Sequence, residues 1–468
     1  MLFIFVAENE IVMLFRKYGK RIEDFLLNPN HNILLVNGAR QIGKSYIIRY
    51  VCNKMFKHFV EVNLKADKEG LAVFASVRST DDFYMQIGAI AGKNLGDKKD
   101  TIIFLDEIQS YPHLMTMLKF LNEEGRYSYI ASGSQLGVAL NQSTSVPMGS
   151  VTVEEMYPLD FEEFLIAVGC GEETIRAMRD SFEARKSLNE SLHNFMLKQF
   201  KIYLLVGGLP AAINKFLENR NMSQVRRIQT NIHNFYRIDA SQYDSEKRLV
   251  IRRIYDAIPS AMENVKKRVV VKNIEETKGH KQFSDYADEF EYLTNSGIAI
   301  QVQAISNPKF PLLQSECKNL LKLYMNDVGV LTDILYRNNI NAVLMDANSI
   351  NLGSVYETAV AQELHAHGNT LHYFDNKQKG EVDFLIDDFA NLSVLPIEVK
   401  SGKDYTVHSA LNKFVSTPDY NIKEAIVLSN EREVFEKKGV AYMPIYYCMF
   451  FTPDSTIEDG CVIPEVLL

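Results

Sequence analysis

The chain has 468 residues, of which 46% are hydrophobic and 24% charged, and its formal net charge is −8. These values are typical of a globular protein with several domains, and they exclude a disordered chain or one whose overall charge attracts polyanions. Five widely spaced cysteines fit neither a disulfide framework nor a zinc site, and no apolar run is long enough to span a bilayer. We therefore expect a cytoplasmic protein that is neither exported nor inserted in a membrane.

The first third of the chain alternates apolar strands with amphipathic helices. A helix is expected over residues 11–27 and a short strand over 32–37, which leads directly into Gly38. Further strands are expected at residues 58–64, 101–105, 127–131 and 151–156. This alternation predicts a parallel sheet covered by helices on both faces.

The pattern changes after Pro158. Residues 160–265 have helical periodicity, broken mainly at 169–171 and 207–210. Residues 266–345 alternate short helices and strands, with a strand at 298–304, and the rest returns to an α/β pattern. Its strands are expected near residues 371–374, 382–386, 393–399 and 425–428. We therefore divide the chain into four parts, namely 1–165, 166–265, 266–345 and 346–468.

A phosphate-binding loop is predicted between the first strand and the next helical run. Residues 38–45 fit the pattern G-x-x-x-x-G-K-[ST], and the residues are Gly38, Ala39, Arg40, Gln41, Ile42, Gly43, Lys44 and Ser45. The two glycines allow successive N–H groups to point at phosphates, and the following helix adds its positive end. Lys44 should reach the β- and γ-phosphates of ATP, while the Ser45 hydroxyl should bind Mg²⁺. A glycine turn followed by a chance Lys-Ser is the minor interpretation.

Two later strands should bring further groups to the same edge of the sheet. The strand at 101–105 ends in Asp106 and Glu107, which we assign to magnesium binding and to proton acceptance from the attacking water. The strand before Ser132-Gly133-Ser134 could place the Ser134 hydroxyl near the γ-phosphate. The alternatives are that the acidic pair caps a helix and that Ser-Gly-Ser is an ordinary turn.

The order and spacing of several motifs resemble one known family. The motifs are Gly38 to Ser45, Phe104-Leu105-Asp106-Glu107-Ile108-Gln109, Ala131 to Ser134, Tyr157 to Phe164, Gly207-Gly208-Leu209-Pro210 and Lys322 to Gly329. Together they resemble the bacterial and archaeal predicted AAA+ type ATPases that carry a C-terminal domain of uncharacterised function. The resemblance implies an AAA+ core, a winged-helix element near residues 270–335 and a C-terminal α/β domain similar to PD-(D/E)xK nucleases. Where many relatives have a basic residue before Tyr-Pro-Leu, this chain has Gly149-Ser150, so an arginine finger at that place is missing or supplied by another arginine.

A second group of charged residues is predicted in the C-terminal part. The runs 380–386 and 395–400 form a hairpin, and a turn centred between Ala390 and Asn391 pairs residues whose numbers sum to 781. Asp383 then faces Glu398, and Lys400 projects from the same face of the strand as Glu398. Two carboxylates suit Mg²⁺, and the ammonium could orient a metal-bound water for attack on a phosphodiester. The alternative is a solvated strand with cross-strand ion pairs.

The family resemblance adds Glu357, on an expected helix, as a further acidic metal ligand. Basic pairs lie at Arg226-Arg227, Lys247-Arg248, Arg252-Arg253 and Lys266-Lys267-Arg268. They are either solvated helix faces or contacts to a phosphate backbone.

Together these features predict an ATPase, with ATP and Mg²⁺ as cofactors, whose nucleotide state positions a nuclease-like domain on DNA. A nucleotide-gated scaffold with an inactive nuclease fold and a protein-remodelling ATPase remain alternatives. The sequence is compatible with an oligomer.

Overall fold

The computed structural model describes residues 13–28, 32–134, 136, 149–240, 247–263, 283–347, 350–402 and 404–453. Contacts divide the chain into two compact units. The first comprises Met1–Leu159, Leu209–Arg220 and Asp288–Ile298, and the second comprises Asp160–Gly208, Asn221–Ala287 and Ala299–Leu468. The four-part division stays a prediction. Lys266, Lys267 and Arg268 lie outside the described residues.

The first unit is built on a five-stranded sheet in the order β2-β3-β4-β1-β5, and every pairing is parallel. The strands are β1 Ile33–Asn37, β2 His58–Asn63, β3 Thr101–Asp106, β4 Ser128–Ser132 and β5 Val151–Glu155. The helices are α1 Lys17–Leu27, α2 Lys44–Met55, α3 Leu64–Glu69, α4 Thr80–Ala91, α5 Pro112–Glu124, α10 Pro210–Asn219 and α13 Ala287–Asn295, whose first residue belongs to the second unit. The predicted parallel sheet is confirmed, with strand ends within two residues of expectation.

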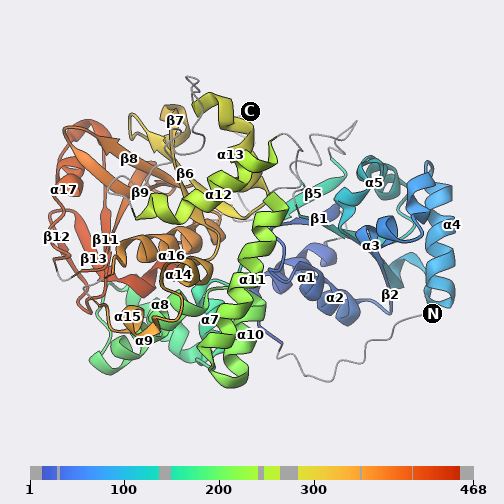
Figure 1. Cartoon of the computed structure of the whole chain (residues 1–468), viewed down its shortest axis with the longest axis horizontal. Helices are drawn as coiled ribbons and strands as arrows, with labels where there is room; N and C mark the ends of the chain where they lie inside the picture. The colour runs from blue at the N-terminus through green and yellow to red at the C-terminus, as the bar shows by residue number, and fades with distance from the viewer. Residues whose placement is uncertain are drawn as a thin grey trace, which may run out of the picture. The chain divides into compact units, whose positions relative to one another are not determined.

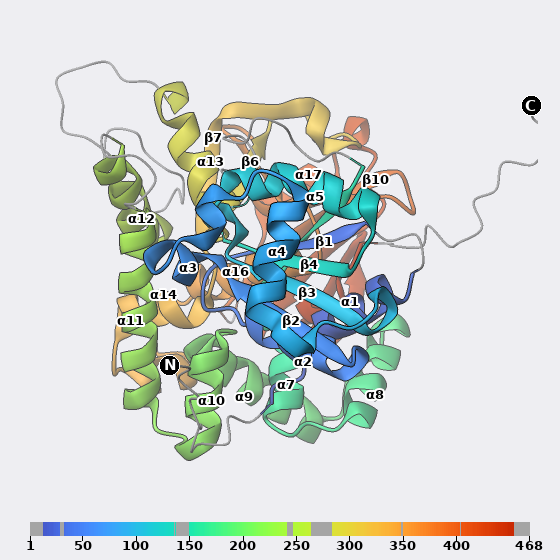
Figure 2. The same ribbon diagram turned by 90° about the vertical axis from the view of Figure 1, so that its right-hand side faces the viewer.

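Both faces of this sheet are covered by helices. In β1 and β3, odd-numbered residues such as Leu35, Ile103 and Leu105 join the core formed with α4 and α5, while even-numbered ones such as Leu34 and Phe104 are buried outside that core. Figure 1 shows α1 and α2 on the side of the strands away from α4, and Figure 2 shows α4 crossing the sheet. Burial on both faces explains why β1 and β3 read as continuous apolar runs.

The second unit combines helices with an eight-stranded mixed sheet in the order β12-β13-β11-β10-β9-β8-β6-β7. The strands are β6 Ala299–Ile305, β7 Glu316–Met325, β8 His372–Asn376, β9 Gly380–Asp388, β10 Ser393–Lys400, β11 Ala425–Ser429, β12 Phe435–Lys437 and β13 Val440–Pro444. The helices are α7 Phe161–Ala167, α8 Glu172–Glu183, α9 Glu190–Val206, α11 Met222–Ala240, α12 Arg248–Met262, α14 Val328–Tyr336, α15 Ile340–Leu344, α16 Gly353–Ala366 and α17 Ser409–Val415.

This sheet joins strands from two of the predicted parts of the chain. β6 pairs in parallel with β8, and β6 and β7 form an antiparallel pair at the sheet's edge. The described residues of 266–345 therefore share a sheet with those of 346–468, and the winged-helix interpretation of that segment stays a prediction. Helix α17 packs on one face through Leu411 and Phe414, while α16 contacts strands β6, β7 and β10.

Among the described helices, none is by itself long and apolar enough to cross a membrane. The bent pair α9 and α10 reaches that length and composition only when both helices are counted together.

Candidate functional site

The predicted phosphate loop lies between the end of β1 and the start of α2. Three of its residues have positive φ, namely Gly38 at 142°, Gln41 at 68° and Gly43 at 94°. A Cβ on Gly38 would lie 2.3 Å from the carbonyl oxygen of Met156, so only glycine fits there. The local geometry therefore needs the first glycine of the motif for close backbone packing as well as for its left-handed conformation.

Lys44 opens α2 and folds over the loop. Its Nζ donates to the carbonyl oxygens of Gly38 and Ala39, both at 2.8 Å, and the residue is only 7% exposed. Burial lowers the pKa of Lys44 to about 8, although the nearby carboxylates of Glu107 and Asp106 oppose this change. A buried ammonium with a lowered pKa gains from an anionic ligand, because the ligand's charge compensates the lost hydration.

At the carboxyl edge of the sheet, the Asp106 carboxylate accepts hydrogen bonds from hydroxyl groups of two other segments. The Ser45 Oγ lies 3.0 Å from both carboxylate oxygens, and the Ser132 Oγ donates to Oδ1 at 2.5 Å. Asn63, paired with Asp106 across β2 and β3, approaches Oδ2 at 3.4 Å. The structure thus brings together the two predicted magnesium ligands, Ser45 and Asp106. Sequence reasoning missed Ser132 and Asn63, although each is a polar residue at the end of a strand.

Glu107 follows in a left-handed backbone conformation, with φ at 58°. Gln109 Nε2 donates to Glu107 Oε2 at 2.6 Å and to Ser134 Oγ at 3.3 Å. Arg40 Nε donates to the same Ser134 oxygen at 3.3 Å. Glu107, Ser134 and Arg40 therefore form one network through Gln109, whose role the sequence did not predict.

Segments outside the motif hold the loop from the other side. Arg16 donates to the carbonyl oxygens of Ile42 at 2.8 Å and of Tyr157 at 2.7 Å. A Cβ on Gly297 would lie 2.9 Å from the Ala39 nitrogen, and Pro210 also contacts the loop at Gly43. In the sequence, Pro210 stands out only as part of a family motif. No local pattern singled out Arg16 or Gly297 as loop contacts.

Ser150 stands near the start of β5, where relatives were expected to have a basic residue. It is 6% exposed, and its carbonyl oxygen accepts a hydrogen bond from Ile33 at 2.9 Å. Its backbone therefore helps to join this segment to β1, and the expectation that an arginine finger is missing or supplied by another arginine stays a prediction.

The second predicted constellation lies in the second unit, at the β9–β10 hairpin. The pairs run from Ser393↔Asp388 to Ile397↔Phe384, so the predicted register, with numbers summing to 781, is confirmed. Ile397↔Phe384 is the last pair of this ladder, and Glu398 and Asp383 come directly after it on the two strands. The Val399 N–H donates to Asp383 Oδ2 at 2.9 Å, and Lys400 Nζ donates to Glu398 Oε1 at 2.7 Å.

Buried charges from neighbouring elements complete this cluster. Glu357 of α16 accepts a hydrogen bond from the Tyr324 hydroxyl at 3.3 Å and is 3% exposed. Lys322 of β7 is fully buried, pairs with Glu381, and has its Nζ 4.7 Å from the centre of the Tyr373 ring. In the sequence, Lys322 belongs to a family motif, and its place in this cluster was not predicted.

The electrostatics of the cluster follow from burial and from crowded carboxylates. Burial first, and then the charge of Asp383, raise the pKa of Glu398 to about 8. Burial would lower the pKa of Lys322, but the carboxylates of Glu381, Glu357 and Asp383 raise it overall. The pKa of Lys400 is also raised overall, because the carboxylate of Glu398 outweighs the effect of burial. The ammonium groups therefore keep their charge and act as counter-ions to the carboxylates.

This arrangement does not fit a bound metal ion. Within the described ranges, no three His, Cys, Asp or Glu side chains are placed to hold one. The charges of Asp383 and Glu357 both raise the pKa of Glu398, yet Lys400 and Lys322 already compensate the carboxylate charge. The oxygen donors suit magnesium in kind, but not in their present arrangement.

The parallel sheet, the phosphate loop and the Ser45–Asp106 contact define the first unit as a P-loop ATPase domain. Residues 30–165 match a family model described as an AAA domain, so the ATPase domain is of the AAA type. Residues 197–340 and 352–448 match two domains of unknown function, DUF8612 and DUF4143. No curated protein matches the sequence.

Several solved structures are similar to the chain. The Walker-type ATPase PABY2304 of Pyrococcus abyssi is 13% identical, over 71% of this chain and 96% of that chain, with a TM-score of 0.40. Cdc6p from Pyrobaculum aerophilum is 13% identical, over 73% and 97% of the two chains, with a TM-score of 0.29. The Thermotoga maritima RuvB Holliday junction branch migration motor is 11% identical, over 61% and 89%, with a TM-score of 0.30. At these values the likenesses do not bear on the activity of this chain.

Proposed function

We propose that the first unit binds ATP with Mg²⁺ and hydrolyses the γ-phosphate. The observation that carries this proposal is the meeting of Lys44, Ser45 and Asp106 at one edge of a parallel sheet, directly beside a loop with three positive φ angles. The AAA domain match covers the same residues.

Each side chain of the site has a proposed role. The loop from Gly38 to Ser45 surrounds the phosphates, and Lys44 leaves its two carbonyl partners to pair with the β- and γ-phosphates. Magnesium held by Ser45 and Asp106 would neutralise charge on those phosphates. Glu107 would accept the proton of the attacking water, and the Ser134 hydroxyl would contact a γ-phosphate oxygen.

Two variants test these roles. Lys44→Ala should abolish ATP binding, measured by calorimetric titration, while the matched variant Lys54→Ala on the same helix should leave it unchanged. Glu107→Gln should bind ATP but hydrolyse it at least about tenfold more slowly, because it loses the proton acceptor and keeps the magnesium ligands. Wild-type affinity in folded Lys44→Ala, or wild-type turnover in Glu107→Gln, would remove the corresponding assignment.

As a second candidate function, we propose that nucleotide state controls a phosphodiester-cleaving site at Asp383, Glu398 and Lys400, acting on DNA. Two observations favour it. The hairpin pairs run up to Ile397↔Phe384, directly beside Glu398 and Asp383, and both of these carboxyl groups are buried near Glu357. Because Lys322 and Lys400 compensate the negative charge of the carboxylates, cleavage would require the two ammonium groups to move away from them.

Cleavage of several DNA forms, with and without ATP and Mg²⁺, tests the second candidate. Asp383→Asn and Lys400→Ala should each reduce cleavage while ATPase activity is kept, and the exposed controls Asp419→Asn and Lys413→Ala should not. If the purified wild type cuts no DNA form, or if both variants cut as well as it does, the cleavage proposal fails. The remaining candidates would then be a nucleotide-gated binding protein with an inactive nuclease-like fold and a protein-remodelling ATPase.

A further inference from the structure

A polar cavity of about 750 Å³ lies in the second unit, between α11 and the end of α14. Figure 1 shows these two helices side by side. The cavity is lined by Ser223, Arg226, Arg227, Thr230, Asn231, His233, Asp333, Ile334, Arg337 and Asn338. Nine of these ten side chains are polar or charged, and three are arginines, whereas the whole chain has a net charge of −8. The cavity is therefore a local concentration of positive charge.

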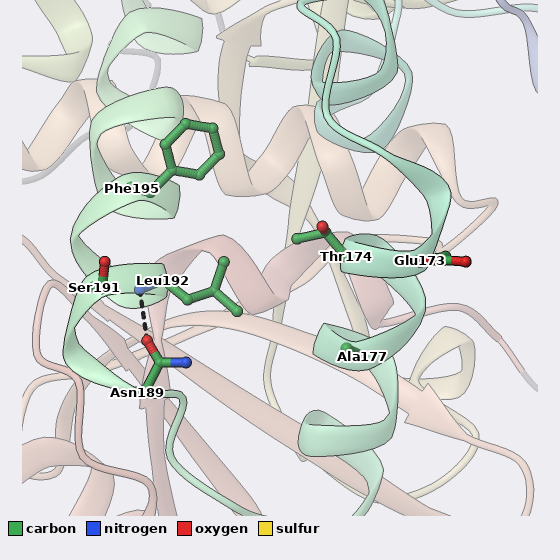
Figure 3. Close-up of a pocket in the computed structure, with 7 residues that line it drawn as sticks. All are labelled: Glu173, Thr174, Ala177, Asn189, Ser191, Leu192 and Phe195. Carbon is green, nitrogen blue, oxygen red and sulfur yellow. Dashed lines mark hydrogen bonds between the residues drawn. The ribbon is translucent and has the colours of Figure 1, made fainter.

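A second hollow in the same unit shows that this composition is not general. It lies between α8 and α9, has a volume of about 550 Å³, and is lined by Glu173, Thr174, Ala177, Asn189, Ser191, Leu192 and Phe195. Figure 3 shows these residues, with Asn189 accepting the hydrogen bond from the Leu192 N–H at 2.9 Å. Its single charged side chain is acidic, so it offers no site for an anion.

Arg226 forms the buried wall of the polar cavity. It is 4% exposed, its Nε donates to the Arg337 carbonyl oxygen at 3.0 Å, and its Nη1 donates to the Gly329 carbonyl oxygen at 3.1 Å. Its Nη2 is buried and donates to no acceptor in the part of the chain that the structure describes. A buried guanidinium nitrogen without an acceptor costs free energy, and the positive charge of Arg226 favours an anion in the adjacent cavity.

Arg227 and Arg337 add two exposed guanidinium groups to the lining. Within the described ranges, neither guanidinium lies close enough to a carboxylate to form an ion pair. Asp333 is the one carboxylate of the lining, and it accepts a hydrogen bond from Thr230 Oγ1 at 2.6 Å. Burial lowers the pKa of His233 to about 4, so this side chain adds no charge at neutral pH. Three guanidinium groups against one carboxylate leave a formal charge of +2.

We propose that this cavity binds a phosphate group of a small organic molecule or of a nucleic-acid end. A phosphate monoester carries about two negative charges near neutral pH, which matches the charge of the lining. Guanidinium groups bind phosphate oxygens through parallel N–H donors, and the hydroxyl and amide groups of Ser223 and Asn231 can satisfy further oxygens. The volume is in the range of pockets that bind small ligands. The site is separate from the ATP site, which lies in the other unit.

Binding is measured on the full chain, with the phosphate loop filled by a non-hydrolysable ATP analogue and Mg²⁺, so that the loop cannot capture the probe. The probes are inorganic phosphate, glycerol phosphate, and a single-stranded oligonucleotide with or without a 5′-phosphate. Arg227→Gln and Arg337→Gln each lose one exposed guanidinium and should weaken phosphate binding at least about tenfold. Arg253→Gln, an exposed arginine on α12 that does not line the cavity, is the matched control. Arg226 is left intact because its hydrogen bonds support the fold.

Saturable binding of glycerol phosphate that falls in both cavity variants but not in Arg253→Gln supports a small-molecule ligand. Binding confined to the 5′-phosphorylated oligonucleotide, with the same dependence on Arg227 and Arg337, supports a nucleic-acid end. The proposal is overturned if no probe binds the wild type, or if the cavity variants bind as well as Arg253→Gln does. ATP turnover, measured in parallel, reports on the phosphate loop independently of this result.

Discussion

The lowered pKa of Lys44 predicts that ATP affinity falls when the solution becomes mildly alkaline. The buried ammonium has a pKa of about 8 instead of the ordinary value of 10.5. It therefore loses its charge above about pH 8 in the free protein. Bound phosphate stabilises the charged form, so the pKa in the complex lies higher than in the free protein. ATP binding above pH 8 must then take up a proton, and each unit of pH weakens it further.

The size of this effect follows from the protonated fraction. With a pKa of about 8, roughly three quarters of Lys44 is charged at pH 7.5 and about a tenth at pH 9.0. The dissociation constant of MgATP should therefore rise about eightfold, equivalent to about 1.2 kcal/mol. Calorimetric titration at both pH values measures it, in the Glu107→Gln background so that hydrolysis does not consume the ligand.

Lys44→Arg in the same background is the matched control. A guanidinium keeps its charge at both pH values, so its affinity, whatever its absolute level, should change little between them. An unchanged dissociation constant in the lysine protein would refute the reasoning. So would an equal loss in the lysine and arginine proteins, since that loss would come from another group.

Three other perturbations follow from the same site. Lys44→Met should raise the free energy of unfolding at pH 7 by up to about 3 kcal/mol, because burial disfavours the ammonium. In the wild type, the free energy of unfolding should rise between pH 8 and 10.5, because there the unfolded chain binds more protons than the folded one. Denaturant unfolding measures both effects. Gly38→Ala should abolish ATP binding and destabilise the fold by more than about 1 kcal/mol, whereas Gly88→Ala on α4, whose added methyl meets nothing within 4 Å, should be neutral or stabilising. Gln109→Leu should lower kcat with KM for ATP little changed, because it releases Glu107 and Ser134 and leaves Lys44 and the phosphate loop as they are. An unchanged kcat in steady-state kinetics would contradict a positioning role.

The sequence could predict those features that depend on residues close together along the chain. The phosphate loop depends on residues 38–45 and one flanking strand, so a local pattern was enough. The β9–β10 register depended on a short turn and on the two-residue period of strands, and it too was confirmed. Ser132 reaches Asp106 only because β4 lies next to β3 in the sheet. Strand order is a long-range property that no run of residues encodes.

The same limit explains the second cluster. Lys322 and Glu381 are far apart in sequence, and they meet because β7, β6, β8 and β9 lie in succession across one sheet. The sequence showed the carboxylates as a pair ready for a metal, since the hairpin is local. It could not show that a strand from another part of the chain would add an ammonium to them.

The two buried lysines also distinguish what the two clusters are built to receive. Lys44 and Lys322 are both buried, but the pKa of the first falls and that of the second rises. The difference lies in the neighbouring carboxylates, since Lys322 has Glu381 in direct contact, whereas among the described residues Lys44 donates to carbonyl oxygens and to no carboxylate. The phosphate loop therefore holds a cation that still lacks its counter-ion, which an anionic ligand supplies. The C-terminal cluster has its counter-ions within the chain, so a cation must displace an ammonium before it can bind there.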